Sequence, residues 1–478
     1  MMSKTFRPFI SHGYVFFVAL TLAAGAGSAQ PAKNAGPVPA YSKLAREIFK
    51  ELIEINTTLN IGSTKAAEAM AQRLRAAGFP ENDIRILGPR PNNKNLVARY
   101  QGRGKLRPIL FIGHLDVVEA RPEDWSFDPF VFLEKDGYFY GRGTTDMKNK
   151  DADLVANFIR LKQEGFVPDR DLILALTDDE EGGDANGIQW LLANHRDLID
   201  AEYCINPDGG GGDTKDGKPI VMEVQTSEKV YINYRLEVKN KGGHSSLPVP
   251  ENAIYRLAAG LTRLAQYEFP LRLNETTRTY FERSASRQTG QTKADMLAML
   301  KTPIDTATAK RLAAASAFYN AMMRTTCVAT MLSGGHAENA LPQSARAIVN
   351  CRMLPDDTPE NVLATLERVL ADSQIIVTRI GEPFLSSLSP LRKDLMEALE
   401  RLTAAMWPGV IVTPNMSTGA TDGRMLRRAG IPVYGVSGMF TDTDDVRAHG
   451  KDERLGVKEF YDGVDFTYKF IKALSRTA

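Results

Sequence analysis

The sequence predicts an α/β protein with a mostly parallel central sheet flanked by helices, interrupted by an inserted α+β domain. Two observations lead to this prediction. Short continuous apolar runs alternate with stretches of helical periodicity in the first half of the chain and again near its end. Such runs are typical of parallel strands that are covered on both faces. Between about residues 228 and 383 apolar and polar residues alternate instead, as they do in half-exposed antiparallel strands.

The first part of the predicted α/β domain begins with two helices, at residues 41–56 and 63–78. The second of these stretches ends in Gly78, as expected just past a helix terminus. A third helix is predicted at residues 148–165 from its periodicity. The predicted strands around it are the apolar runs NLVARY (95–100), RPILFIG (107–113), DLILALT (171–177) and AEYCIN (201–206).

The middle of the chain has a different texture. VYINYRLEVKN (230–240) alternates like an antiparallel strand, and a polar helical segment extends from about Leu271 to Met323. The other elements predicted here are helices at 251–266 and 359–373 and strands at 325–332 and 347–354. The α/β texture returns at about Phe384 and ends on an amphipathic helix at 457–474. We therefore expect one domain formed by residues 41–227 and 384–478, with residues 228–383 inserted into it.

The N-terminus has the three parts of a secretory signal. Lys4 and Arg7 precede the apolar run GYVFFVALTLAAGAG, and small residues follow it, so cleavage is expected after Ala29. Residues 30–40 then form a Pro/Ala-rich linker. The apolar run is short for an uncleaved membrane anchor. The sequence therefore predicts an exported protein, periplasmic or secreted, with no membrane association once residues 1–29 are removed.

Composition excludes several classes of function. The chain has 478 residues, 43% of them hydrophobic and 24% charged, and a formal net charge of +1. Without a basic excess there is no electrostatic case for binding nucleic acid or an anionic membrane. The three cysteines, Cys204, Cys327 and Cys351, lack the close spacing of a zinc knuckle or a disulfide framework. Cys327 and Cys351 lie in two runs that could pair as neighbouring strands, and such pairing would allow a disulfide between them. We expect buried free thiols instead.

Acidic and imidazole side chains follow the predicted parallel strands, where a sheet of this kind carries its site. RPILFIG leads into His114 and Asp116, DLILALT into four acids from Asp178 to Glu181, and AEYCIN into Asp208. Asp146 follows a Gly-rich turn, and His449 lies near the end of the chain. Two imidazoles and several carboxylates without thiols suit a divalent metal pair, zinc first and manganese or cobalt next. A cation pair would also explain why four carboxylates are placed side by side.

Seven short motifs occur in an order that resembles one known family. They are HLDVV, GRGTTDMK, TDDEEGG, PDGGGG, GGHSS, ENALPQ and HGKDE. The chain is similar over its mature length to the di-zinc amidohydrolases and exopeptidases of peptidase family M20, which include glutamate carboxypeptidase, aminoacylase-1, succinyl-diaminopimelate desuccinylase and carboxypeptidase S. The resemblance implies a zinc-exopeptidase-like catalytic domain and an inserted lid or dimerisation domain. It also implies two Zn²⁺ ions per chain and a peptide or small-molecule substrate.

The resemblance assigns roles to individual residues. Asp146 is expected to bridge both metals, with His114 and Asp208 completing one site and Glu181 and His449 the other. Asp116 is expected to accept the second ring N–H of His114, which would fix its tautomer. Glu180 matches the general base, and His244 matches a residue that stabilises the oxyanion. The positions that match substrate contacts in relatives are Asn339, Arg352 and Arg424.

These roles imply hydrolysis of an amide bond in peptides or N-acyl amino acids, of the carboxypeptidase or deacylase type. An Arg suits capture of a free carboxylate through two hydrogen bonds. Two alternatives remain open: a non-catalytic binding protein on the same fold, or dipeptidase or aminopeptidase specificity. In several relatives the inserted domain forms a two-fold dimer and its His reaches the neighbouring active site. A homodimer through residues 228–383 is therefore expected, although the segment Leu271–Met323 could instead cover the dimer edge.

Overall fold

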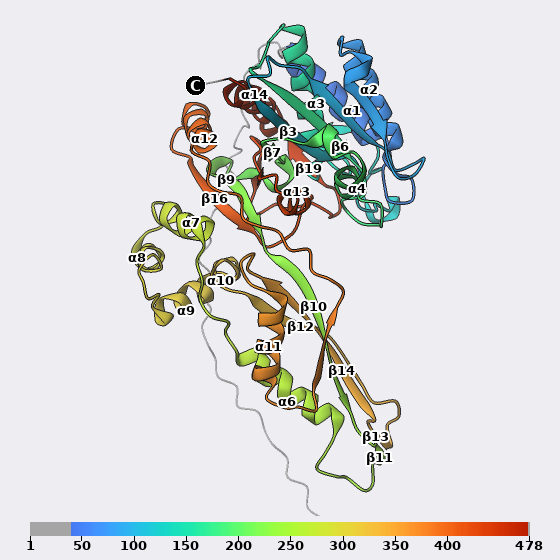
Figure 1. Ribbon diagram of the computed structural model, residues 1–478, viewed down its shortest axis with the longest axis vertical. Coiled ribbons are helices and arrows are strands. Elements are labelled where there is room, and N and C mark those ends of the chain that lie inside the picture. Colours follow the sequence, from blue (N-terminus) through green and yellow to red (C-terminus); the bar gives the residue numbers. More distant parts are fainter. Residues whose placement is uncertain (1–39, 477–478) are drawn as a thin grey trace, which may run out of the picture. The chain divides into compact units, whose positions relative to one another are not determined.

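The structure is a computed structural model, and it describes residues 40–476 (Figure 1). The predicted signal (1–29) and nearly all of the predicted linker lie outside the described residues. Within them, no helix is both long enough and apolar enough to cross a membrane.

A six-stranded sheet with the order β1-β2-β6-β3-β7-β17 forms the centre of the α/β part. β6, β3, β7 and β17 run parallel to one another, whereas β1 and β2 add an antiparallel edge. The prediction of a mostly parallel sheet is therefore confirmed. The strand bounds are β1 (Ile84–Leu87), β2 (Asn95–Tyr100), β3 (Leu106–His114), β6 (Arg170–Thr177), β7 (Tyr203–Ile205) and β17 (Val433–Tyr434).

Helices cover both faces of this sheet because successive strand residues point to opposite sides. On β3, Phe111 belongs to one apolar core, and its neighbours Leu110 and Ile112 belong to a second. The first core is shared with α1 (Ala40–Glu54), α2 (Thr64–Ala76), α3 (Lys148–Gln163), α12 (Lys393–Met406) and α14 (Val457–Leu474). The second is shared with α4 (Gly187–Asn194), α5 (Arg196–Ile199) and α13 (Gly423–Arg428). The result is a three-layer arrangement.

A four-stranded sheet with the order β16-β9-β8-β18 is a feature that the sequence reasoning missed. Its strands are β8 (Gly211–Lys215), β9 (Lys218–Glu228), β16 (Ile411–Ser417) and β18 (Phe440–Asp442). Part of the glycine-rich run after Asp208 is strand rather than loop. The dipeptide Asp216-Gly217, with φ values of 52° and 69°, forms the tight turn between β8 and β9. Such a turn is a recognised hairpin signal. A smaller sheet joins β4 (Leu133–Lys135), β5 (Tyr138–Tyr140) and β19 (Arg454–Gly456).

The middle of the chain forms a separate antiparallel sheet with the order β12-β14-β10-β15. Burial alternates along β10, and its buried side chains pack with two helices in a third core. The elements are β10 (Val230–Lys239), β12 (Thr326–Gly334), β14 (Ser344–Met353), β15 (Ile376–Ile380), α6 (Ala253–Gln266) and α11 (Pro359–Leu370). A two-stranded ribbon, β11 (Gly243–His244) with β13 (Ala340–Leu341), lies beyond the end of β10 (Figure 1). The combination of helices with antiparallel strands that was predicted for the middle of the chain is present.

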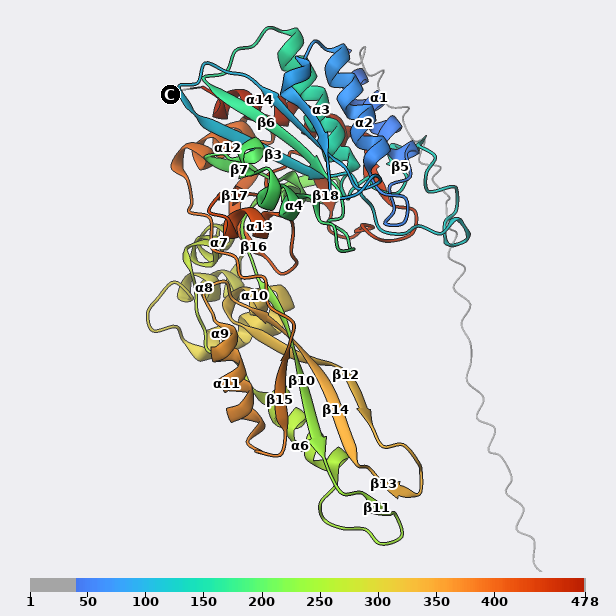
Figure 2. The same cartoon turned by 45° about the vertical axis from the view of Figure 1, so that its right-hand side comes forward.

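The polar helical segment folds as four short helices with a core of their own (Figure 2). They are α7 (Glu275–Ala285), α8 (Gly290–Ala298), α9 (Thr306–Ala315) and α10 (Ala317–Met323). The apolar side chains that they bury include Phe281, Met296 and Leu312. Arg283 on α7 donates to the main-chain oxygen of Val412, which fastens α7 to β16.

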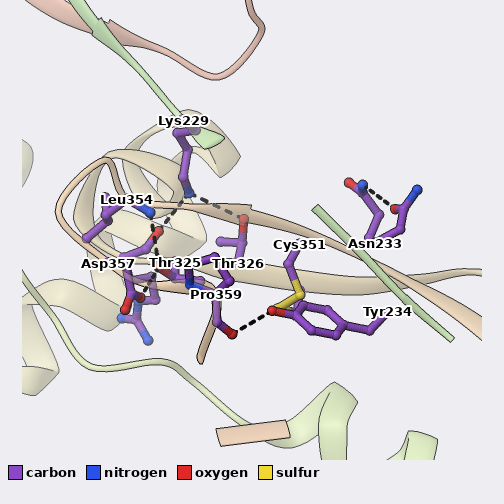
Figure 3. The surroundings of a disulfide bond; sticks show 12 residues. Lys229, Asn233, Tyr234, Thr325, Thr326, Cys351, Leu354, Asp357 and Pro359 are labelled. Carbon is purple, nitrogen blue, oxygen red and sulfur yellow. Dashed lines mark hydrogen bonds between the residues drawn. A yellow bond between two sulfur atoms is a disulfide. The ribbon is translucent and has the colours of Figure 1, made fainter. Parts of the chain in front are cut away.

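The expectation of free thiols at Cys327 and Cys351 is wrong, because these residues form a disulfide. They lie directly opposite each other on β12 and β14, and this register brings their β-carbons within reach. Figure 3 shows Cys351 beside Tyr234 of β10. Cys204 is buried and free.

Candidate metal centre and active site

Three neighbouring parallel strands deliver the acidic and imidazole side chains to one edge of the central sheet. His114 is the last residue of β3, and Asp116 follows two residues later. β6 ends at Thr177, immediately before the run of acids, and β7 ends just before the 3₁₀ turn that contains Asp208. Because β6, β3 and β7 are adjacent and parallel, their carboxyl ends meet at the same edge.

Five of these side chains form two groups that share one carboxylate. Ligand atoms of His114, Asp146 and Asp208 all lie within 4.8 Å of one another, and the same is true of Asp146, Glu181 and His449. Nε2 of His114 lies 3.1 Å from Oδ1 of Asp146, and Nε2 of His449 lies 3.1 Å from Oδ2. The two oxygens of Asp146 therefore face different imidazoles. This is the arrangement that a carboxylate bridging two metals requires.

The electrostatics of this cluster favour a cation. Burial, together with neighbouring carboxylates, raises the pKa of Asp208 and raises that of Glu181 to about 7. Burial lowers the pKa of His114, but hydrogen bonds to Asp116 and Asp146 outweigh it, and this pKa lies well above its ordinary value. So many acids close together repel one another, and divalent ions among them would reverse that repulsion. The nitrogen and oxygen donors fit a pair of zinc-like ions.

Asp116 holds the acidic loop as well as facing His114. Its carboxylate accepts the backbone N–H groups of Glu180 and Glu181 at 3.2 and 2.9 Å. Nδ1 of His114 lies 3.1 Å from the main-chain oxygen of Asp116 and 3.6 Å from its carboxylate. The acceptor nearest to the ring is thus the main-chain oxygen of Asp116 rather than the expected carboxylate.

The four consecutive acids divide into two pairs with different surroundings. Asp178 is buried and accepts hydrogen bonds from Ser63 and Asn93, which anchors the loop to an earlier part of the chain. Asp179 accepts the N–H of Ala185 and has a left-handed φ of 66°, a conformation that Asp tolerates. The turn then presents Glu181 to the cluster. Burial first, and then the nearby carboxylates of Asp422, Asp208 and Glu181, raise the pKa of Glu180 well above its usual value.

Arg352 and Arg424 lie close to each other. Burial lowers the pKa of Arg352, and the charge of Arg424 lowers it further. Among residues 40–476 neither guanidinium pairs with a carboxylate: Arg352 lies over the ring of Tyr231, Arg424 lies over Phe384, and Nε of Arg424 has no hydrogen-bond partner. Two cations that have no carboxylate partner in the described part of the chain are suited to receive an anionic group.

The sequence reasoning missed a third cation beside this pair, Lys229. Lys229 is buried, donates to the main-chain oxygen of Arg324 at 2.7 Å, and lies next to Thr326 (Figure 3). Burial lowers its pKa to about 7, with a further contribution from Arg352. Lys229 and Arg424 line the same cavity of about 180 Å³. The only available sequence signal was its position between β9 and β10.

His244 lies on the β11–β13 ribbon, Asn339 directly precedes β13, and both residues are exposed. Nδ1 of His244 contacts Oγ of Ser246 at 2.7 Å, and the main-chain oxygen of Asn339 accepts the backbone N–H of Ser245. Glu228 lies near the cluster, because its charge helps to raise the pKa of Asp208. The ten residues of β10 lie between Glu228 and the ribbon. An extended strand of ten residues spans about 30 Å. Within one chain, therefore, neither residue joins the metal cluster.

The comparisons with known proteins identify the family of the chain. The sequence model of peptidase family M20/M25/M40 matches residues 110–473. The chain is 30% identical over 384 residues to the N-fatty-acyl-amino acid synthase/hydrolase PM20D1 of Bos taurus, covering 77% of this chain and 74% of the relative.

Two solved structures show the same fold. One is an M20 family metallo-carboxypeptidase from Sulfolobus solfataricus, with a TM-score of 0.64, 16% identity, and coverage of 90% of this chain and 98% of that one. The other is a dinuclear metal-binding peptidase of the M20 family from Bacillus subtilis, with a TM-score of 0.58, 12% identity, and coverage of 91% and 99%. The chain belongs to peptidase family M20/M25/M40 and is a hydrolase of its metallopeptidase and amidohydrolase class.

Proposed function

We propose that this protein is an exported dinuclear zinc hydrolase that cleaves the amide bond of peptides or N-acyl amino acids with a free carboxylate. The observation that carries the proposal is the pair of ligand groups sharing Asp146, with Glu180 beside them. The names of two similar proteins, an N-fatty-acyl-amino acid synthase/hydrolase and a metallo-carboxypeptidase, support the same reaction class.

His114, Asp146, Asp208, Glu181 and His449 would hold the two ions. Bound ions of this kind supply a water whose pKa is lowered to about 7, and they polarise a carbonyl group. Glu180 has a raised pKa and adjoins the cluster without belonging to either ligand group. It is therefore suited to accept the proton of the attacking water and to deliver it to the leaving amine.

The free carboxylate of the substrate would bind at Arg352 and Arg424. Both guanidiniums lack a carboxylate partner within residues 40–476, so an incoming carboxylate relieves their repulsion without breaking an ion pair. The enzyme should discriminate strongly between a free acid and its neutral analogue, because the neutral analogue leaves the two guanidinium groups unpaired.

Two features support a homodimer in which His244 acts in the neighbouring active site. Within one chain β10 holds His244 away from the cluster. Exposed apolar side chains also gather near the ribbon and on the edge strand β12, among them Leu247, Tyr255, Met331 and Leu332. Exposed strand edges and apolar surfaces of this kind favour association.

Export is supported by the signal-like N-terminus and by the disulfide, because disulfides persist in oxidising compartments.

The decisive experiment uses purified mature protein loaded with zinc, and a set of N-acyl amino acids and dipeptides. Each substrate is paired with its C-terminal amide. We expect turnover of the free acids and at least tenfold lower kcat/KM for the amides. Equal turnover of both members of each pair would contradict carboxylate recognition and favour aminopeptidase specificity. No turnover of any compound by the dimetal protein would favour a binding protein.

A further inference from the structure

The two loops that carry Asp146 and His449 are fastened to each other by one buried carboxylate, Glu453. Its side chain is completely buried, and Arg142, its ion-pair partner, is almost as deeply buried. Glu453 lies four residues after His449 in HGKDE, and Arg142 lies four residues before Asp146 in GRGTTD. Each motif thus contributes one member of the metal cluster and one member of this ion pair.

Glu453 accepts five hydrogen bonds from the loop that ends at Asp146. Oε2 accepts from Nη1 of Arg142 at 2.7 Å and from the N–H of Gly143 at 3.0 Å. Oε1 accepts from the N–H and the hydroxyl of Thr145, both at 2.7 Å, and from the N–H of Asp146 itself at 3.1 Å. A carboxylate surrounded in this way has little freedom to move, and the backbone of Asp146 is positioned by it directly.

The same ion pair reaches the loop that carries His449. Nη2 of Arg142 lies 3.4 Å from the main-chain oxygen of His449 and 3.2 Å from that of Gly450. His449 has a left-handed φ of 62°, and its side chain is 52% exposed. Little packing therefore holds the imidazole, and a strained, exposed residue keeps its conformation only when the surrounding backbone imposes it.

We infer that Glu453 is the positioning residue for the metal centre: it sets the distance between the shared carboxylate of Asp146 and the imidazole of His449. The inference rests on the proposed metal site, not on any particular substrate. Glu453 touches neither group of ligand atoms, so its effect would pass through the backbone of Asp146 and through Arg142. Partners outside the ligand set commonly change metal affinity by about 10–100-fold when they are altered.

The first test measures zinc affinity directly, by competition with a chromophoric chelator and without substrate. Glu453→Gln keeps the shape of the side chain but replaces one acceptor oxygen with a donor that faces N–H groups. We expect zinc binding weaker by at least about tenfold, with the larger loss at the site formed by Asp146, Glu181 and His449. Asp295→Asn is the control for loss of a buried carboxylate bonded to an Arg, since Asp295 pairs with Arg311 on the α8–α9 helices. It should lower the melting temperature and leave zinc affinity unchanged.

A second pair of variants decides the matter even if Glu453→Gln fails to fold. Thr145→Val removes the hydroxyl that bonds Glu453, whereas Thr144→Val removes a buried hydroxyl with no hydrogen-bond partner among the described residues. Thr145→Val should weaken zinc binding about three- to tenfold, and Thr144→Val should not. Equal zinc affinities in these two variants, or wild-type affinity in folded Glu453→Gln, would overturn the inference. Because zinc is the probe, these outcomes stay distinct from a failure to find the substrate.

Discussion

Nε2 of His449 lies 2.9 Å from Oε1 of Glu181, although 268 residues separate them in the sequence. Glu181 belongs to a loop at the end of a central strand, and His449 to a loop that follows β18 and precedes β19. Each side chain also adjoins Asp146, so one carboxylate lies at the junction of three distant segments. The predictions below depend on this convergence.

Adjacent glutamates should respond differently to truncation. Glu180→Ala should keep two zinc ions per chain and lose about 10²–10⁴-fold in kcat, because in the proposed mechanism Glu180 moves a proton and holds no metal. Glu181→Ala should lose one ion, because it removes a member of the second ligand group. Metal analysis of the two dialysed variants tests this, each serving as the control for the other. Equal zinc content in both would mean that their roles are misassigned.

Two inactive variants should complement each other if His244 crosses to the neighbouring subunit. Glu180→Ala and His244→Ala are mixed in equal amounts after subunit exchange has been demonstrated. Each heterodimer would contain one site with neither defect, so random mixing should restore about a quarter of wild-type activity. If no activity returns, His244 does not act in trans.

The arginine pair should determine the response to the charge of the substrate. Arg352→Met is expected to reduce kcat/KM for a free-acid substrate by about 10–100-fold, since it removes charge-assisted hydrogen bonds. The same variant should leave kcat/KM for the matched C-terminal amide within about threefold. Arg346 provides the control, because it already pairs with Glu237 on the same strand pair. Arg346→Met should leave kcat/KM unchanged for both substrates. If Arg352→Met reduces kcat/KM by a similar factor for the free acid and for the amide, carboxylate binding at Arg352 is contradicted.

The disulfide between Cys327 and Cys351 should be present in protein purified without reductant and should contribute to stability. The protein unfolded without reductant should expose one reactive thiol, Cys204, and three after reduction. Replacing both Cys327 and Cys351 with Ser should lower the free energy of unfolding by about 2–4 kcal/mol, because the cross-link constrains the unfolded chain. Thiol counting by mass spectrometry and denaturant titration measure the two effects. Three reactive thiols in protein purified without reductant would contradict the prediction.

A buried acid remote from the metal cluster should make stability depend on pH. Burial raises the pKa of Asp153 to about 8, despite hydrogen bonds from Thr467 and Asn157. In the unfolded chain the pKa of an Asp is about 3.9. The contribution of Asp153 to the free energy of unfolding is therefore fully present below about pH 4 and is lost as pH rises towards 8. Relative to Asp153→Asn, the wild-type protein should lose stability between pH 5 and 8, by more than about 1 kcal/mol.

Asp295→Asn is the control for this pH series. The hydrogen bond from Arg311, outweighing the effect of burial, lowers the pKa of Asp295 below its ordinary value. The contribution of Asp295 to the free energy of unfolding is present above about pH 4 and is lost only in more acidic solution. The difference between wild type and Asp295→Asn should thus stay constant from pH 5 to 8. Urea titrations at each pH measure both differences, and parallel curves for wild type and Asp153→Asn would refute the Asp153 prediction.

The sequence by itself determined many of the helices and strands and the chemical groups that their ends offer. The run at residues 95–100 and the amphipathic stretch at 457–474 coincide with β2 and α14, because periodicity records which side chains each element buries. His114, Glu181 and Asp208 were predicted to meet because the carboxyl ends of adjacent parallel strands share one edge. The hairpin of β8 and β9 was missed, although Asp216-Gly217 signals its turn.

Only the tertiary structure decided how distant segments pair. The disulfide depends on the register that sets Cys327 opposite Cys351, and local periodicity is the same for any register that keeps the buried face. The position of His244 depends on the direction and length of β10, which carries it away from the cluster of its own chain. The role of Glu453 depends on contact with a loop more than 300 residues earlier. A sequence pattern specifies which groups a segment offers, whereas folding the whole chain specifies which groups they contact.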